Sequence, residues 1–321
     1  MIISYGINNL NPIHLPVVTI GTFDGLHLGH HEVLKRLIEE ARRIGGNSVV
    51  ITFQPHPRKI LFPERDDFFI LSSDAEKICL LERTGIDHLI ILEFTKEFSS
   101  LSAEEFTKDY LIEKIQLKKL IVGREHQFGK RREGNHNDLI DLSKKYQFEY
   151  EEIADQLMDS ISISSTKIRN ALLEGELAMA NALLGYPYFI TGTVVEGNRL
   201  GHQIGFPTAN VEPDNADKLL PRNGVYAIKA EIENEFFDGM LNIGVRPTFD
   251  FMNRTIEAHL FNFDRDIYGK NIRVYFLERL RNETKFSGID AMKAQLHVDK
   301  TNAAEVLVKY ANFSSFLPCP V

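Results

Sequence analysis

Cysteine is scarce in this chain, and long apolar runs are absent. The 321 residues include two cysteines, Cys79 and Cys319, which lie far apart in the sequence. Two cysteines in a chain of this length do not make a disulfide framework, which favours a reducing compartment. No run approaches the ~18 apolar residues that span a bilayer, and the N-terminus lacks the basic start and apolar stretch of a signal peptide. The sequence therefore predicts a soluble, cytoplasmic protein with no membrane partner.

An excess of positive charge is also lacking. The chain has 37 Lys and Arg against 45 Asp and Glu, a formal net charge of −8, which argues against general charge attraction to nucleic acid. Two motifs are missing as well. No GxxxxGK[ST] loop is present to cradle phosphates, and no GxSxG turn is present to carry a covalent nucleophile. Hydrophobic residues make up 43% of the chain, which is ordinary for a soluble globular protein.

The first half of the chain alternates strands with helices. Val- and Ile-rich runs that are typical of buried strands occur at residues 17–21, 48–53, 88–94 and 119–123. Patterns with apolar residues at helical spacing separate them, at residues 30–43, 74–85 and 102–115. This alternation predicts an α/β domain, a doubly wound parallel sheet with helices on both faces.

The second half has a different rhythm. Strand-like segments follow one another with turn residues between them, at residues 189–197, 224–232, 236–244, 255–263 and 271–280. This pattern predicts an antiparallel sheet or small barrel, closed by a helix from Ile289 to Tyr310. Pro187 disfavours a continuing helix, so we place the domain boundary there, with domains at 1–185 and 186–321.

The segment GTFDGLHLGH, residues 21–30, lies between a predicted strand and a predicted helix. Ligands of open parallel sheets bind at such turns, and a helix N-terminus offers free N–H groups and partial positive charge. Gly25 and Gly29 allow a tight turn and a close backbone approach, and His27 and His30 can add donors to a phosphate. The spacing alone also fits a zinc pair or two incidental histidines, but the context favours a phosphate site.

A second segment, SISSTKIRNAL at residues 162–172, precedes a helical pattern. Its Ser and Thr residues are good N-caps, so a plain helix start is one interpretation. Lys167 and Arg169, however, oppose the helix dipole in the first turn. Cations at that position are more easily explained by a nearby anion.

The second half opens with glycines at every fourth position, Gly197, Gly201 and Gly205, which favours a glycine-rich flap over a helix. Thr208 and Asn210 follow, and both offer oxygen ligands suited to Mg²⁺, although a plain turn is the alternative.

Glu257 lies further along, in a run whose alternation places it on one face with Thr255 and His259. There a carboxylate can act as a base toward a hydroxyl, and the alternative is an exposed strand glutamate.

These motifs together resemble a known enzyme family. GTFDGLHLGH, ISSTKIR, TFQPHPRKI at 52–60 and IVGREHQFGKRREGN at 121–135 resemble the HxGH nucleotidyltransferase module of bacterial FAD synthetases. GFPTAN, LNIGVRPTF, IEAHLFNFDRDIYG and LRNETKF resemble the riboflavin kinase domain, which implies a six-stranded Greek-key barrel. The chain departs from the family at Glu125-His126, where an Asp-Phe pair is common, and at His202, where Arg is frequent.

The resemblance implies a role for each site residue. The implied catalytic residues are Glu257, as base on the ribityl 5′-hydroxyl, and His27, His30 and Arg169. The implied contacts to ATP and its phosphates are Gly21, Phe23, Asp24, Gly29, Ser164, Ser165, Thr166, Gly201, Gly205, Thr208 and Asn210. The implied flavin contacts are Glu125, Phe128, Arg281 and Glu283. Thr208 and Asn210 are also implied as contacts to Mg²⁺.

The resemblance implies two reactions. The barrel would transfer the γ-phosphate of ATP to riboflavin, and the α/β domain would transfer AMP from a second ATP to FMN, giving FAD and pyrophosphate. The expected cofactor is Mg²⁺, and the expected partners are riboflavin, FMN, FAD and ATP, with self-association left open. Two alternatives are an enzyme with one active half and a flavin-binding regulator without turnover; against the regulator, a pure binder needs no base such as Glu257.

Overall fold

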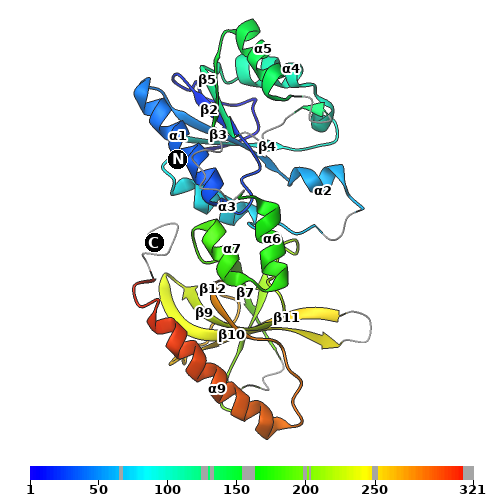
Figure 1. The fold of residues 1–321 in the computed structure, drawn as a ribbon, viewed down its shortest axis with the longest axis vertical. Helices are drawn as coiled ribbons and strands as arrows, with labels where there is room; N and C mark the ends of the chain where they lie inside the picture. Colours follow the sequence, from blue (N-terminus) through cyan, green and yellow to red (C-terminus); the bar gives the residue numbers. More distant parts are fainter. Residues whose placement is uncertain are drawn as a thin grey trace. The chain divides into compact units, whose positions relative to one another are not determined.

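The computed structural model describes residues 1–64, 68–123, 129–130, 134–153, 163–197, 201, 204–247 and 252–313 (Figure 1). The chain forms two compact units. The first consists of Met1–Ile70 and Asp74–Ser164, and the second of Leu71–Ser73 and Ser165–Val321. The domain boundary at 185 and 186 stays a prediction from the sequence.

The first unit is built on a six-stranded parallel sheet of order β1-β4-β3-β2-β5-β6. Its strands are β1 (Ile2–Tyr5), β2 (Val17–Ile20), β3 (Ser48–Gln54), β4 (His88–Glu93), β5 (Lys119–Gly123) and β6 (Glu149–Ile153). Its helices are α1 (Leu28–Arg43), α2 (Pro57–Leu61), α3 (Asp74–Glu82), α4 (Ala103–Phe106) and α5 (His136–Tyr146), with a 3-10 turn at Phe98–Ser100 and a π-helical turn at Thr107–Ile112.

Helices cover both faces of this sheet, which confirms the predicted doubly wound α/β fold. On one face α1 packs against β2, β3 and β5. Its Leu34, Leu37 and Ala41 are buried, at the spacing of one helical stripe. On the other face, apolar residues of the central strands form a core with residues from α4, the π-helical turn and α5. Because both faces are covered, all four residues of β2 are buried.

The second unit contains a closed, six-stranded antiparallel barrel of order β10-β11-β8-β7-β12-β9, as the sequence predicts. Its strands are β7 (Phe189–Val195), β8 (Ala209–Pro213), β9 (Gly224–Ile232), β10 (Glu235–Pro247), β11 (Met252–Leu260) and β12 (Asn271–Arg281). Its helices are α6 (Ser165–Glu174), α7 (Leu177–Leu184) and the terminal α9 (Ile289–Val308).

The terminal helix α9 packs along the outside of the barrel, against β9, β10 and β12 (Figure 1). Strand β9 is buried at eight of its nine positions because its inner face lines the barrel core and α9 covers its outer face. Helix α7 ends before Pro187, at Gly185, whose φ of 83° is left-handed and suits glycine. No described helix is long and apolar enough to cross a membrane.

Candidate functional site

The GTFDGLHLGH turn leaves the carboxyl end of β2, in the middle of the parallel sheet. The chain continues from β2 to β3 on one side, and β5 lies on the other, so this is the point where the strand order reverses. Positive φ angles at Phe23, Gly25 and Leu26 fold the turn tightly, and Phe23 and Asp24 are buried. A Cβ at Gly21 would lie 3.1 Å from the ring of Phe23, so this ring would have to shift slightly to admit a side chain there.

Helix α1 begins directly after His27. The carbonyl oxygen of His27 accepts hydrogen bonds from the amides of His30 (2.8 Å) and His31 (3.1 Å), while its imidazole does not cap the helix. The first turn contains no acidic residue. The first N–H groups of α1, including that of Gly29, have no partner within the helix. They point outward at its N-terminus, which is the positive end of the helix dipole.

The rings of His27 and His30 stack at this helix start. Their centroids are 3.7 Å apart with an interplanar angle of 15°, and the ring of Phe23 lies 5.1 Å from that of His30. The Nδ1 atom of His30 is buried without a hydrogen-bond partner among the described residues. Burial, and next the neighbouring His27 and His31, lower the pKa of His30 well below its ordinary value, so the ring is neutral at pH 7.

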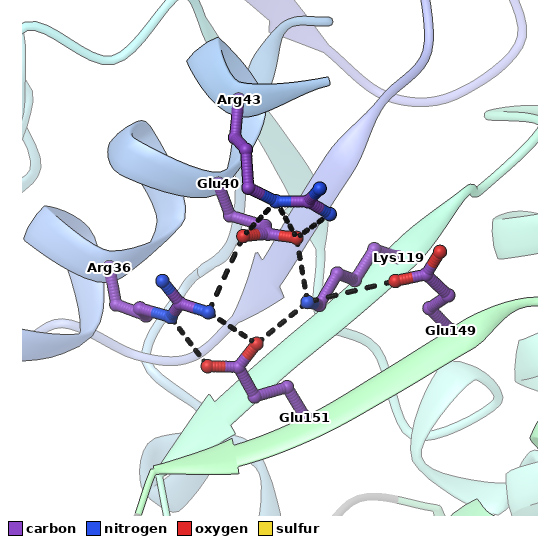
Figure 2. Close-up of polar contacts among 6 residues, drawn as sticks. All are labelled: Arg36, Glu40, Arg43, Lys119, Glu149 and Glu151. Carbon is purple, nitrogen blue, oxygen red and sulfur yellow. Dashed lines mark hydrogen bonds and ion pairs between the residues drawn. The ribbon is translucent and has the colours of Figure 1, made fainter.

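A network of charged side chains anchors the same helix to the sheet (Figure 2). Glu40, on α1, has 1% of its side chain exposed and accepts hydrogen bonds from Arg43 and from Lys119 of β5. Glu151, on β6, lies 2.7 Å from Lys119 and accepts hydrogen bonds from Nε and Nη2 of Arg36. The hydrogen bonds from Arg43 and Lys119 lower the pKa of Glu40 to about 2, and the one from Arg43 has the larger effect.

In the barrel, three polar residues lie side by side on adjacent strands. Glu257 of β11 pairs with Asn210 of β8 on one side and with Asn242 of β10 on the other. Residues that pair directly across antiparallel strands share a face. The neighbours Ile256 and Ala258 are buried, at 3% and 1% exposure. Glu257 is therefore on the opposite, outer face.

Two glycines of the glycine-rich segment lie close to Asn210 and Thr208. A Cβ on Gly197 would be 2.0 Å from Nδ2 of Asn210. A Cβ on Gly201 would be 2.2 Å from the carbonyl oxygen of Phe206 and 3.3 Å from Oγ1 of Thr208. Glycine at both positions thus lets the backbone pack against the Thr and Asn side chains. Gly205, with a φ of 81°, turns the chain toward Thr208.

A histidine continues the same face of β11. His259 is buried, and its Nδ1 lies 2.7 Å from the carbonyl oxygen of Pro207, immediately before Thr208. Burial lowers the pKa of His259. This contact ties the start of β8 to β11.

The segment after β12 brings a second carboxylate toward the row. Glu283 accepts hydrogen bonds from the amide of Val245 and from Nδ2 of Asn223, both at 3.3 Å. One of its oxygens would lie 2.5 Å from a Cβ on Gly244. Gly244 pairs with Thr255, two residues before Glu257 on β11.

Comparisons with known proteins identify the family of this chain. Residues 13–167 match the FAD synthetase family model, and residues 184–307 match the riboflavin kinase family model. The chain is 38% identical over 317 residues to the bifunctional riboflavin kinase/FMN adenylyltransferase of Buchnera aphidicola subsp. Schizaphis graminum, covering 96% of this chain and 98% of that protein. The chain belongs to the bifunctional riboflavin kinase/FMN adenylyltransferase family. Both enzyme domains are present.

Two further relatives extend the comparison. The protein of the same name from Listeria monocytogenes is 37% identical, with 91% of this chain and 93% of that protein covered. A crystal structure from Streptococcus pneumoniae, described as a macrolide-efflux protein, superposes with a TM-score of 0.86 at 32% identity, covering 95% of this chain and 99% of that chain.

The structure groups many of the predicted site residues. In the FAD synthetase domain, one turn holds Gly21, Phe23, Asp24, His27, Gly29 and His30. In the riboflavin kinase domain, Asn210 and Glu257 share an outer face of the barrel, and Gly201 lies near Thr208, with Gly205 between them in the sequence. The roles of these residues in binding and catalysis stay predictions.

Other predicted residues are not grouped with these sites. Ser164 ends the first unit, while Ser165, Thr166 and the buried Arg169 belong to α6 of the second unit. Their closing over the same nucleotide as His27 therefore stays a prediction. Four further positions of the sequence analysis lie outside the described residues: Glu125, His126, Phe128 and His202.

Sequence reasoning misses Asn242, although its segment LNIG is part of the family resemblance. Its position beside Glu257 is visible only from the strand register. A plain turn does not describe all of residues 207–210. Ala209 and Asn210 are the first residues of β8, and they pair with β11.

Proposed function

We propose that the outer-face row of the barrel is the riboflavin kinase site and that the GTFDGLHLGH turn is the FMN adenylyltransferase site. The observation that carries the first assignment is the register that aligns Asn210, Glu257 and Asn242, with Gly197 packed close to Asn210. It places a carboxylate next to the side chains suited to hold a nucleotide. The corresponding support for the second is the stacked histidine pair at the start of α1.

In the kinase reaction, Glu257 accepts the proton of the ribityl 5′-hydroxyl as its oxygen attacks the γ-phosphorus of ATP. The bond between the γ-phosphorus and the β,γ-bridging oxygen breaks, and ADP leaves with FMN as the other product. Asn242, on the neighbouring strand, offers an amide that can orient the same hydroxyl. Glu283 and Arg281 are the proposed flavin contacts.

The chemistry of the donor set fits Mg²⁺. The Thr208 hydroxyl and the Asn210 amide are hard oxygen donors, and Mg²⁺ takes few protein ligands beside phosphates and water. The cradle without Cβ atoms at Gly197 and Gly201 leaves backbone close to both side chains. When bound, Mg²⁺ would neutralise triphosphate charge. Within the described residues, no group of three or more His, Cys, Asp or Glu could hold a metal ion.

In the adenylyltransferase reaction, a phosphate oxygen of FMN attacks the α-phosphorus of ATP and pyrophosphate leaves. The amides of the first turn of α1 and the rings of His27 and His30 donate hydrogen bonds to the phosphates. A neutral His30 can donate from one nitrogen, and a bound polyphosphate favours its protonated form. Ser165, Thr166 and Arg169 are proposed to close over the same nucleotide. A cytoplasmic location and the absence of nucleic-acid and membrane partners stay predictions from composition.

One time course tests both assignments. The purified chain is incubated with riboflavin, excess ATP and Mg²⁺, and the flavins are separated by chromatography. We expect FMN to appear first and FAD later. FMN without FAD would mean an inactive first domain, and bound flavin without any product would favour a regulator.

A further inference from the structure

Helix α9 presents a buried carboxylate to the end of β12. Asp299 is 1% exposed and accepts two parallel hydrogen bonds from Arg281, from Nε at 2.8 Å and from Nη2 at 2.7 Å. Gln295, one turn earlier on α9, donates a third hydrogen bond at 2.9 Å. Such a bidentate pair fixes the plane of the guanidinium as well as its position.

The guanidinium of Arg281 in turn contacts the segment Asn282–Phe286 at both of its ends. Nη1 donates to the carbonyl oxygen of Asn282 at 2.9 Å. The ring of Phe286 lies 5.7 Å from the guanidinium carbon, within range of a cation–π contact. Arg279 adds a hydrogen bond to the side chain of Asn282, at 2.8 Å. The path of this short segment therefore depends on where Arg281 is held.

Glu283 lies inside this segment and reaches the barrel face that carries Glu257. Its hydrogen bonds to Val245 and Asn223 are both long, at 3.3 Å, and its side chain is exposed. Weak local contacts of this kind do not hold a carboxylate in one place by themselves. The short contacts are those that Arg281 makes with the buried carboxylate of Asp299.

We propose that Asp299 is a positioning residue of the kinase site, which holds Arg281 and through it the segment that carries Glu283 against the barrel face of Glu257. A buried ion pair contributes little net stability compared with apolar packing, but it does fix geometry. The inference rests on the proposed function, in which Glu283 and Arg281 contact the flavin. Asp299 itself touches no substrate.

The test uses the full chain and Asp299→Asn, which keeps the shape and removes the charge. We expect the KM for riboflavin to rise about tenfold, the size of one lost charge-assisted hydrogen bond, with kcat within about twofold. FMN adenylylation should be unchanged. Arg281→Lys should raise the same KM, and the double variant should show less than the product of the two effects, because both act through one contact.

The matched control is Lys309→Met, which removes the exposed ion pair between Lys309 and Glu278 of β12 at the other end of α9. It tests whether any weakened docking of α9 raises the KM. An unchanged KM in Asp299→Asn together with a lowered Tm would show that Asp299 contributes to stability alone, which would overturn the proposal. If Asp299→Asn does not fold, Gln295→Ala removes one support of the same carboxylate, and an unchanged KM there overturns it too.

A further variant separates this proposal from the function on which it rests. If Glu283→Gln leaves the riboflavin KM unchanged, the flavin contact assigned to Glu283 is wrong. If Glu283→Gln raises the KM and Asp299→Asn does not, only the positioning role fails.

Discussion

Nζ of Lys119 on β5 lies 2.8 Å from Oε1 of Glu40 on α1, and Glu40 is nearly inaccessible to solvent. This contact joins the helix that begins with the paired histidines to the strand next to β2. Helix α1 thus has its proposed phosphate-binding end at the switch point of the sheet, and near its other end charged side chains hold it to the sheet (Figure 2).

Lys119→Met should lower the free energy of unfolding by about 3 kcal/mol, because it leaves the buried carboxylate of Glu40 without one of its cations. Chemical denaturation measures the change. The matched control is Lys145→Met, which removes an exposed pair with Glu104 and should cost under about 1 kcal/mol. Equal effects of the two variants would contradict the anchoring role of Lys119.

The same network predicts an acid-sensitive component of stability. The folded pKa of Glu40, about 2, lies below its ordinary value of 4.5, so the folded state favours the ionised form. Its contribution is present above pH 4.5 and is lost as the pH falls toward 2. The pKa difference corresponds to at most about 3 kcal/mol, and the solvent exposure of Arg43 reduces this contribution. The stability difference between wild type and Glu40→Gln should shrink over this range, and a constant difference from pH 5 to 2.5 would contradict the assignment.

His30→Ala should stop FAD formation while FMN still accumulates. The stacked ring is lost from the proposed phosphate site, and a fall of about a hundredfold or more in the adenylylation rate is expected for a donor to a developing charge. Chromatography of the flavins after separate incubations with riboflavin and with FMN, each with ATP, measures the two reactions. His31→Gln, the adjacent histidine outside the stack, is the control. FAD synthesis near the wild-type rate in His30→Ala would remove the ring from the mechanism.

Gly197→Ala should impair the kinase reaction alone. A methyl group at this position would lie 2.0 Å from Nδ2 of Asn210, so Asn210 or the flap has to move. We expect the KM for ATP in riboflavin phosphorylation to rise at least about tenfold, with FMN adenylylation unchanged. Gly288→Ala, where a Cβ meets open space, is the control. An unaltered kinase in Gly197→Ala would mean that the flap does not depend on this close approach.

The sequence predicts the elements in which burial alone sets the residue pattern. Strands β2 to β5 are apolar runs because both faces of the sheet are covered. Strand β6 is not predicted, because its sequence, EYEEI, is acidic rather than apolar. Its Glu151 forms ion pairs with Arg36 of α1 and Lys119 of β5. A partner on a distant strand cannot be read from local periodicity.

The candidate site shows the same division. Alternation along β11 correctly predicts the face of Glu257, since strand geometry is local. The neighbours of Glu257, Asn210 and Asn242, depend on the register of three strands, which nothing in one segment fixes. The burial of Asp299 is not predicted either. A single acidic residue on a helix is usually exposed to solvent, and its partner on β12, Arg281, is known only from the structure.

Glu257→Gln should abolish riboflavin phosphorylation and leave FMN adenylylation intact. The amide keeps the shape of the side chain and its place between Asn210 and Asn242, but it cannot take the proton of the 5′-hydroxyl. A loss of about a hundredfold or more in kcat with a nearly unchanged KM for riboflavin is therefore expected, since the interaction removed acts in the transition state. Supplied FMN should still become FAD, which controls for folding. Full kinase activity in this variant would show that the proton leaves by another route and that the carboxylate serves only to orient its neighbours.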